Sequence, residues 1–469
     1  MAALDTVAEA SANPDGGTFE RVARFTLALE PDEIPEPVLE RAALLLLDTL
    51  GICAAAAPME AGRLGRETAR RLFAPGSPED AATMLFDGRP ASLAGAVFAA
   101  ATQTDNLDGH DGYNPTKGHI GVVAVPALAA LAEHLPTLSG REALAALVVG
   151  YEVAGRAGIA LHASVEDYHT SGAWNALGVA AMAVRMRGGS AEVLRQALGI
   201  AEYHGPRSQM MREIATPTML HDGSGWGGLA GLSAAILAEQ GFTGAPAITV
   251  EAPEAAPHWA DLGRFWHVPE QYVKPYPICR WAHPSIDAVR ELCQGSAIAP
   301  ERIAAIHIRS FENAVRLFST MPATTSEAQY SLAFAVGTMI AHGRIGLPEI
   351  SGAGLSDPAV ARLVALTTTE AAPRHEARFP AARWADVTIT LEDGAVHASG
   401  DVHARGGPER PFGSTEVTGK FRAFAEPVLG AERAQAMCSA VLALTRKDSV
   451  FGDVLSVLHA PVLDGSTAH

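Results

Sequence analysis

Residues 141–164, REALAALVVGYEVAGRAGIALHAS, are apolar on most faces of a helix and contain small residues throughout. Three further segments share this pattern: 39–57 (LERAALLLLDTLGICAAAA), 173–188 (AWNALGVAAMAVRMRG) and 225–242 (GWGGLAGLSAAILAEQGF). A helix that is apolar all round is buried on all sides, as in the inner layers of a bundle. Alanine and glycine let helix axes approach closely, so we assign these small residues to packing. The sequence therefore predicts a large helical domain over residues 18–271.

The character of the sequence changes after about residue 268. Residues 302–310 (RIAAIHIRS) alternate as a half-buried strand does, and residues 387–402 (VTITLEDGAVHASGDV) predict two strands that turn at Asp393-Gly394. An apolar helix is expected between them, over residues 331–343. Together these elements predict a smaller α+β domain over residues 272–411.

The two ends of the chain are assigned separately. Residues 412–469 return to helical periodicity and are expected to complete the first helical domain. Residues 1–17 are polar and are expected to form a mobile tail. The fold class expected for the whole chain is therefore mainly α, with a smaller α+β domain.

Composition narrows the range of partners. The chain has 469 residues, of which 48% are hydrophobic, and its formal net charge is −17 at pH 7. This length and hydrophobic content support a large core with more than one compact unit. The negative charge argues against nucleic acid or an anionic membrane surface as a partner. An anionic ligand has to be held by a local cluster of Lys, Arg and His side chains.

The cysteines and the N-terminal segment indicate the cellular setting. Four cysteines are widely spaced and form no C-x-x-C pair: Cys53, Cys279, Cys293 and Cys438. This spacing argues against a zinc site or a dithiol redox centre, and reduced thiols favour a cytoplasmic location. The first residues, MAALDTVAEASANPDGG, lack the basic and then apolar pattern of an export signal. The most apolar stretch, 42–57, is interrupted by Asp48 and Thr49, so no membrane span is expected.

The most unusual segment is the polar loop 104–119, TDNLDGHDGYNPTKGH, which runs directly into an apolar helix. Six chemically useful side chains occur within it: Asp105, Asp108, His110, Asp111, Lys117 and His119. The residues alone leave open a solvated acidic turn, a metal site or an acid–base pair. The spacing matches neither an EF-hand nor a helical H-E-x-x-H motif, so we assign no metal ligands. His119 is the candidate acid or base, because an unperturbed imidazole titrates near neutral pH.

A second polar segment, 273–288 (VKPYPICRWAHPSIDA), lies at the expected boundary between the two domains. Lys274 and Arg280 provide cations for an anionic substrate, and Tyr276 is placed to pass a proton. The alternative is a rigid linker that these side chains brace. Cys279 and His283 are interpreted as residues that line the same cleft, since nothing indicates a lowered thiol pKa.

Two shorter segments place a histidine just before a helix. His169 lies in YHTSGAWNALG (168–178) and His221 in MLHDGSGWGG (219–228). Each is either part of a polar wall at a helix N-terminus or a capping segment with a structural imidazole. The glycines of the second segment match neither a phosphate-binding loop nor a G-x-S-x-G elbow, which leaves nucleotide cofactors and serine hydrolysis without support.

Taken in order along the chain, these motifs resemble the MmgE/PrpD family, whose members include 2-methylcitrate dehydratase, cis-aconitate decarboxylase and iminodisuccinate epimerase. The resemblance rests on LLLDTLGICAAA, DNLDGHDG with GHIGVVAVPALAALAE, YHTSGAWNALGVAA, LHDGSGW and KPYPICRWAHPSIDA. It implies a helical domain built from both ends of the chain and an α+β lid domain. It also implies a homodimer that acts on a small anionic polycarboxylate without a required cofactor.

The resemblance also implies roles for particular residues. Asp105, His119, His169 and Lys274 match polar positions that line the active site in the decarboxylase branch. Gly109 and Thr218 stand where that branch has threonine and lysine, which disfavours decarboxylation of cis-aconitate itself. The loop DGHDGYNPTKGH and the segment DGSGWG are more similar to the epimerase branch.

The expected function is a dehydratase-like lyase that abstracts a proton α to a carboxylate. The alternatives are an epimerase or isomerase of a substituted succinate such as iminodisuccinate, and a non-catalytic polycarboxylate-binding protein. In this scheme His119 is the base or acid, Asp105 orients it, and Tyr276 or His169 is its counterpart. Lys274 and Arg280 hold carboxylates. The other expected substrate-site residues are Asp108, His110, Lys117, His221, Cys279 and His283.

Overall fold

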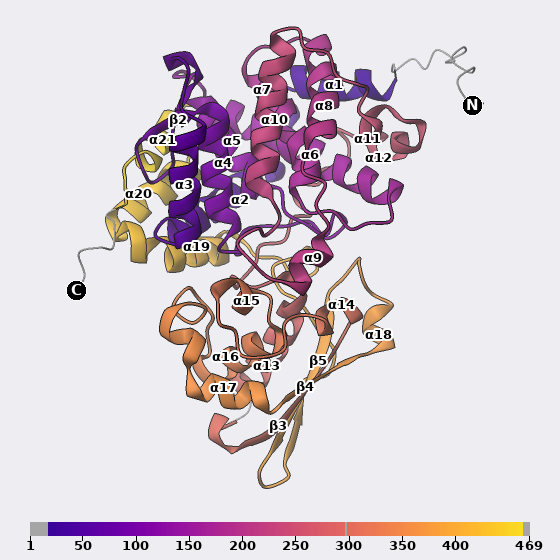
Figure 1. Cartoon of the computed structure of the whole chain (residues 1–469), viewed down its shortest axis with the longest axis vertical. Helices are drawn as coiled ribbons and strands as arrows, with labels where there is room; N and C mark the ends of the chain where they lie inside the picture. Colours follow the sequence, from indigo (N-terminus) through magenta and orange to yellow (C-terminus); the bar gives the residue numbers. More distant parts are fainter. Residues whose placement is uncertain (1–16, 296–297, 463–469) are drawn as a thin grey trace.

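A computed structural model describes residues 17–295 and 298–462 (Figure 1). The tail expected over residues 1–17 lies outside these residues, apart from Gly17. The chain forms a large helical domain and a smaller α+β domain, joined by several crossing segments (Figure 1). The expected fold class is confirmed.

The first part of the helical domain contains twelve α-helices and one small hairpin. The helices are α1 (Thr18–Ala28), α2 (Glu36–Ala56), α3 (Glu60–Leu72), α4 (Leu93–Asp105), α5 (Gly121–Ala132), α6 (Gly140–Ser164), α7 (Gly172–Met186), α8 (Ala191–His204), α9 (Met210–Ala215), α10 (Ser224–Glu239), α11 (Ile248–Glu251) and α12 (Ala256–Trp259). Strands β1 (Ala81–Thr83) and β2 (Pro90–Ser92) pair antiparallel between α3 and α4. This hairpin was not predicted from the sequence.

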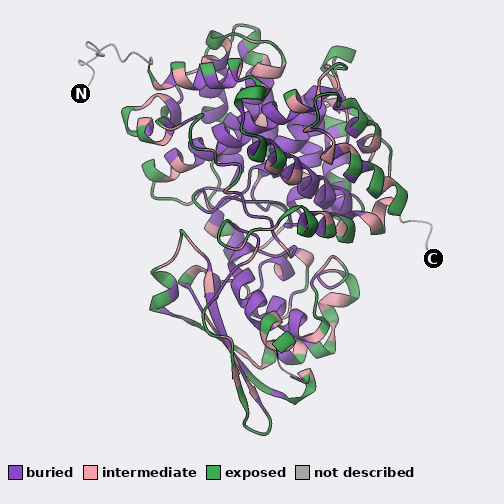
Figure 2. Cartoon of the chain, turned by 180° about the vertical axis from the view of Figure 1, so that it is seen from behind, coloured by how far each residue is buried: buried purple, intermediate pink, exposed green. Residues whose placement is uncertain are grey.

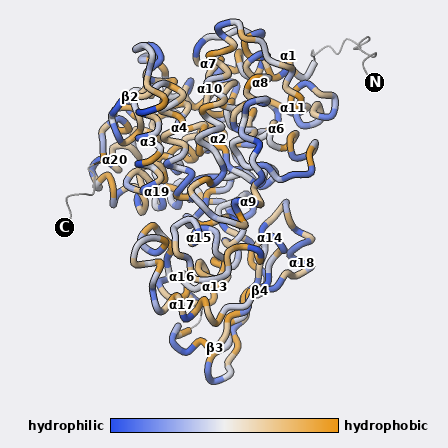
Figure 3. Tube along the Cα trace, in the orientation of Figure 1, coloured by the Kyte–Doolittle hydropathy of each residue, from blue (hydrophilic) through white to orange (hydrophobic). Residues whose placement is uncertain are grey.

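The longest helix, α6, lies in the interior of the domain. It begins with a capping box, in which the Ser139 hydroxyl accepts from the Glu142 amide at 3.2 Å and the Glu142 carboxylate accepts from the Ser139 amide at 2.9 Å. It packs along α7, where a side chain at Gly178 would come within 2.7 Å of Ala154 Cβ. The small residues of these helices therefore permit close packing, and buried, hydrophobic residues fill this domain (Figures 2 and 3).

By length and apolar composition alone, two features could span a membrane: α6 by itself, and the bent pair of α2 and α3. In α6, however, 94% of the most apolar window is buried inside the protein. A helix whose apolar surface is already covered by its own domain has the burial expected of a core helix.

The C-terminal segment returns to the helical domain. It forms α19 (Ser414–Leu429), α20 (Ala431–Leu442) and α21 (Gly452–Leu458), and α19 packs along α2. Gly51 of α2 allows this approach, because a Cβ there would lie 2.8 Å from the Phe421 ring of α19. Segments far apart in sequence thus lie side by side, with α19 next to α2 (Figure 1).

The smaller domain is a mixed sheet covered by helices. Its strands are β3 (Ile303–Ser310), β4 (Thr367–Ala371), β5 (Trp384–Leu391), β6 (Val396–Ala398) and β7 (Val402–His403), and its helices are α13 (His283–Gly295), α14 (Glu312–Val315), α15 (Thr325–Gln329), α16 (Leu332–His342), α17 (Pro358–Ala365) and α18 (Pro373–Glu376). The sheet order is β4-β3-β5-β6, with β7 also paired to β5. The turn at Asp393-Gly394 joins β5 to β6, and Gly394 has the positive φ of 83° that such a turn requires.

The strand over residues 302–310 and the helix over residues 331–343 are confirmed as β3 and α16. Strand β4, which pairs parallel to β3, was not predicted. Its residues, TTTEA, are mostly exposed or half-buried, so the sequence carries no apolar alternation there.

Candidate active site

The two polar segments singled out in the sequence meet between the domains. The Gly112 amide donates to the Tyr272 carbonyl at 3.0 Å, and the Tyr272 amide donates to the Gly112 carbonyl at 2.8 Å. Gly112 has no room for a side chain, because a Cβ would clash with the Tyr272 hydroxyl and lie 2.8 Å from His119 Nδ1. This backbone pairing holds the loop after α4 against the segment that leads into the lid domain.

A pocket lies at this junction. It is lined by Asp108, Lys117, His119, Tyr168, Met210, Ile214, Asp222, Tyr272, Lys274, Cys279, Arg280, Trp281, Tyr330 and Arg383. Six of these are among the expected site residues: Asp108, Lys117, His119, Lys274, Cys279 and Arg280. The helical domain supplies the imidazole and both carboxylates of this pocket, whereas Tyr330 and Arg383 come from the lid domain.

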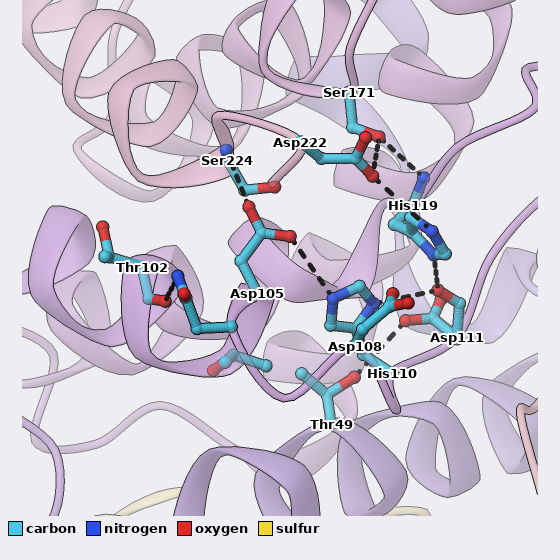
Figure 4. Close-up of polar contacts among 12 residues, drawn as sticks. Thr49, Thr102, Asp105, Asp108, His110, Asp111, His119, Ser171, Asp222 and Ser224 are labelled. Carbon is cyan, nitrogen blue, oxygen red and sulfur yellow. Dashed lines mark hydrogen bonds and ion pairs between the residues drawn. The ribbon is translucent and has the colours of Figure 1, made fainter. Parts of the chain in front are cut away.

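The position and tautomer of His119 are fixed by its neighbours (Figure 4). Its Nδ1 lies 2.6 Å from the Asp111 carbonyl oxygen, which can only accept, so Nδ1 carries the proton. Its Nε2 is left with a lone pair and lies 3.5 Å from Asp222 Oδ2. The Ser171 hydroxyl accepts from the His119 amide at 3.0 Å and donates to Asp222 at 3.0 Å. Ser171 therefore fixes the position of His119 relative to Asp222.

The protonation states favour a neutral base beside a protonated acid. Burial, with the positive charge of Lys274, lowers the pKa of His119 well below its usual value. Burial, together with the nearby carboxylates of Asp105 and Asp108, raises the pKa of Asp222. At neutral pH the pocket then holds an unprotonated Nε2 next to a carboxylic acid, which is a usable pair for moving a proton.

Lys274 forms a buried ion pair with Asp108. Its Nζ donates to the Asp108 carbonyl at 3.1 Å and also pairs with the Asp108 carboxylate. Asp108 has a positive φ of 48°, as do two other expected site residues, Lys117 at 55° and His221 at 44°. Left-handed backbone is uncommon for such residues and costs energy, and it is concentrated where side chains must be aimed at a site.

Asp105 has a different contact from the one expected. Its carboxylate accepts from the Ser224 amide at 3.2 Å and lies 3.5 Å from His110 Nε2 (Figure 4). The His110 ring packs edge-on against His119, with ring centroids 4.5 Å apart. Asp105 thus reaches His119 only through His110, and the Asp111 carbonyl orients His119 instead.

Tyr276 and His283 lie outside this pocket. The Tyr276 hydroxyl donates to Asp287 at 2.9 Å and accepts from Arg405 at 2.9 Å, and it lines a different cavity that also contains Lys420. The His283 Nε2 lies 2.8 Å from the Ile278 carbonyl. The prediction that Tyr276 is a proton donor therefore does not fit its position, because its hydroxyl is already engaged on the far side of the segment.

Two further predicted histidines also lie outside the set that lines the pocket. His169 is buried, and its amide donates to His162 Nε2 at 3.3 Å. Its neighbours Tyr168 and Ser171 make the contacts to the site. His221 packs against the ring of Tyr330 at 5.6 Å, which places it behind the lining residues.

Several lining residues were not predicted: Tyr168, Asp222, Tyr272, Tyr330 and Arg383. Three of them adjoin predicted residues, since Asp222 follows His221, Tyr168 precedes His169, and Tyr272 lies two residues before Lys274. A search for every polar residue within two positions of a candidate would have found those three. Arg383 and Tyr330 have no such signal in the sequence, because the lid brings them to the pocket.

The Cys279 side chain lines the pocket as a thiol. Burial raises the pKa of Cys279 to about 12. The thiolate is the nucleophilic form, so this cysteine is suited to packing rather than attack.

One group of described residues has spacing compatible with a metal, His375, Asp386 and Asp401, whose ligand atoms lie within 4.8 Å of one another. It lies in the lid domain, outside the pocket. Asp386 is paired with Arg309, and both carboxylates are paired with Arg374. Positive charge already compensates these carboxylates, so the group is better described as an ion-pair network.

Comparison with known proteins identifies relatives over most of the chain. The profile of the MmgE/PrpD N-terminal domain matches residues 20–255, and that of the MmgE/PrpD C-terminal domain matches residues 276–445. Human cis-aconitate decarboxylase is 27% identical over 373 residues, which cover 74% of this chain and 75% of that protein. A cis-aconitate decarboxylase-like protein of Aspergillus oryzae is 24% identical, covering 92% of this chain and 95% of its own. Cis-aconitate decarboxylase of Aspergillus terreus is 23% identical, covering 97% and 99%.

Proposed function

The chain belongs to the MmgE/PrpD family, and on that premise we propose that it is a cofactor-independent lyase that removes a proton α to a carboxylate of a small di- or tricarboxylate. The main support for this proposal is His119, which is neutral and has its tautomer fixed by the Asp111 carbonyl. It lies in a pocket lined by four cationic side chains: Lys117, Lys274, Arg280 and Arg383. The net charge of −17 makes this local cluster of cations unusual for the molecule.

The reaction needs a base, a site for developing negative charge and an acid. In the proposal His119 Nε2 accepts the α proton, and the electron pair of the broken C–H bond moves into the adjacent carboxylate. Lys274 stabilises this charge, since fixed positive charge in a buried site is worth far more than in water. The β C–O bond then breaks, and the departing hydroxide takes a proton from Asp222 to leave as water.

An epimerase is the second candidate, and the pairing of His119 with Asp222 favours it. If no leaving group is present at the β carbon, the carbanion must be reprotonated. A protonated Asp222 beside an unprotonated imidazole provides separate donor and acceptor groups. Gly109 and Thr218, which replace two polar positions of the decarboxylase branch, are compatible with this outcome.

Proton NMR in deuterium oxide with a panel of di- and tricarboxylates tests the proposal. New alkene signals with loss of water identify a lyase, whereas exchange of the α proton without elimination identifies an epimerase. The H119Q variant is expected to lose about 10²–10⁴-fold in rate, the usual contribution of a general base. If the wild-type protein binds a ligand but catalyses neither exchange nor elimination, it is a non-catalytic binding protein.

We also propose a homodimer in the cytoplasm. The dimer follows from the family resemblance, and the location is supported by four free cysteines: Cys53, Cys279, Cys293 and Cys438. Light scattering coupled to size exclusion gives the mass directly, and a value near 49 kDa, that of one chain, would contradict the dimer.

A further inference from the structure

Two guanidinium groups in the pocket are buried. Arg280 is 4% exposed and Arg383 is 1% exposed. Within residues 17–295 and 298–462, no carboxylate forms an ion pair with either side chain, and the Nε of each has no hydrogen-bond partner. Other buried arginines differ, since Arg66 pairs with Asp87 and Arg156 pairs with Glu152.

The contacts that these two groups do make are neutral. Arg280 donates to the Arg405 carbonyl at 2.6 Å and stacks on the Tyr272 ring, 4.4 Å from its centroid. Arg383 donates to the Pro380 carbonyl and lies 5.0 Å from the centroid of the Phe379 ring. Carbonyls and ring faces orient a guanidinium and stabilise it partly, but they do not cancel its charge.

Burial disfavours the charged form of both guanidinium groups. Burial lowers the pKa of Arg280 to about 10 and lowers the pKa of Arg383 as well. Burial of a cation without an anion disfavours the charged form, so an arriving anion recovers that free energy. The sites are therefore arranged for a ligand that brings the missing negative charge.

The other charged side chains of the pocket determine how many negative charges a ligand must bring to neutralise it. Lys274 is compensated by Asp108, and Asp222 is held protonated. Lys117 lies over the Tyr168 ring at 4.3 Å and is partly exposed. In the part of the chain that the structure describes, Arg280, Arg383 and, at the pocket edge, Lys117 are left without an ion-pair partner.

The positions of these cations separate two subsites. Arg280 lies against the Tyr272 ring and Arg383 against the Phe379 ring. Lys274 and Asp222 are the titratable groups beside His119. Among the described residues, neither arginine forms a hydrogen bond or ion pair with His119 or Asp222, so the two guanidinium groups are separate from the proton-transfer pair.

We infer that Arg280 and Arg383 form a clamp for a second carboxylate of the substrate, remote from the carbon that loses its proton. The clamp rests on the proposed function and assigns the second carboxylate of its di- or tricarboxylate substrate to these two arginines. Arg280 donates to the Arg405 carbonyl of the lid domain and Arg383 lies immediately before β5, so the lid carries both guanidinium groups into the pocket that His119 lines from the helical domain. Arg383 is thereby a specificity-determining residue supplied by the lid.

Calorimetric titration with unreactive acids tests the clamp without requiring turnover. Succinate offers two carboxylates and butyrate offers one. In R383Q and in R280Q, succinate is expected to bind about 30- to 100-fold more weakly than in the wild type, since each loses a charge-assisted hydrogen bond to a buried partner. Butyrate, whose single carboxylate can occupy only one of the two subsites, is expected to bind the wild type at least about tenfold more weakly than succinate.

The matched control is R378Q, five residues before Arg383 on the same lid surface. Arg378 pairs with Asp401 and is outside the pocket, so this variant should bind succinate as the wild type does. R383K keeps the charge without the planar fork and should lie between wild type and R383Q. Melting temperatures show that each variant is folded.

Two results would overturn the clamp: wild-type succinate affinity in folded R383Q and R280Q, or a wild-type protein that binds butyrate as tightly as succinate. Neither depends on catalysis. If the NMR panel shows neither elimination nor proton exchange while succinate binding still depends on Arg383, the proposed function fails and the clamp remains.

Discussion

Two buried lysine–aspartate pairs lie on either side of the loop that carries His119, and they have different surroundings. Lys274 pairs with Asp108 at the pocket, where His119, Asp222 and two uncompensated arginines also converge. Lys420 of α19 pairs with Asp48 of α2 at 2.6 Å beneath the loop, and also donates to the Gly109 carbonyl at 2.6 Å. The first pair faces a ligand site, whereas the second ties two helices to the backbone of the loop.

The chemistry of a buried ion pair does not by itself reveal the role of the pair. Both lysines are almost fully buried, and both aspartates have a pKa raised by burial and opposed by the lysine. The groups around each pair distinguish them. The pair at the pocket should matter for rate, and the pair beneath the loop should matter for stability.

The largest effect is expected from K274M. Loss of the cation that faces the developing carbanion should lower kcat/KM by about 10³-fold, the upper value for one electrostatic stabiliser. Steady-state kinetics with the substrate identified by NMR measures this loss, with circular dichroism to show that the variant is folded. Activity within tenfold of wild type would remove Lys274 from the chemistry.

A comparable change, but in stability, is expected from K420M. Breaking a buried pair by removing one partner leaves Asp48 charged and unpaired, which should lower the free energy of unfolding by about 3–5 kcal/mol. Denaturant unfolding measures it. The double variant D48N/K420M should recover part of the loss, because no unpaired charge remains.

The kcat of folded K420M sharpens the contrast between the pairs. It should stay within about tenfold of wild type, since Lys420 acts on the loop through the Gly109 carbonyl and does not line the pocket. If K420M and K274M lost the same amount of kcat at equal stability, the division between the two pairs would be wrong.

A smaller effect is expected in the dependence of kcat on pH, which Asp222 controls in the same pocket as the Lys274–Asp108 pair. Burial raises the pKa of Asp222 to about 8, so its acid form is present below that pH and is lost as pH rises through it. Because that acid form supplies the proton in the proposed mechanism, kcat should fall about tenfold per pH unit above this value. The D222N variant should lack this alkaline limb, and a wild-type profile flat to pH 10 would argue against Asp222 as the acid.

The smallest effect is expected from Y276F. The Tyr276 hydroxyl bonds Asp287 and Arg405 away from the pocket, so kcat should change by less than about threefold. Stability should fall by about 1 kcal/mol, the usual net value of one hydrogen bond. A loss of 10²-fold or more in kcat would restore Tyr276 as a proton donor.

Much of the fold could be predicted because its signals are local. The buried helices, the strand over residues 302–310 and the turn at Asp393-Gly394 each follow from the periodicity or turn chemistry of a short segment. The β1–β2 hairpin and β4 could not be predicted in this way, because their strands are short or exposed and depend on pairing with a neighbour.

The candidate site was predictable only in part. The sequence indicated two polar segments, and those segments do pair through Gly112 and Tyr272. It did not assign partners correctly, since Asp105 contacts His110 and the acid beside His119 is Asp222. Partner choice depends on side-chain directions at distances of a few ångströms, which spacing along the chain does not specify.

The sequence by itself determined the composition of the site: an acidic protein with a local supply of imidazole, carboxylate and lysine in two loops, and the family to which the chain belongs. Only the tertiary structure decided which groups act together. It fixed the tautomer of His119 through the Asp111 carbonyl, separated the Lys274 and Lys420 pairs, and brought Arg383 from the lid to the pocket. The physical reason is that charge and pKa depend on burial and on neighbours across space, and both exist only once distant segments have packed.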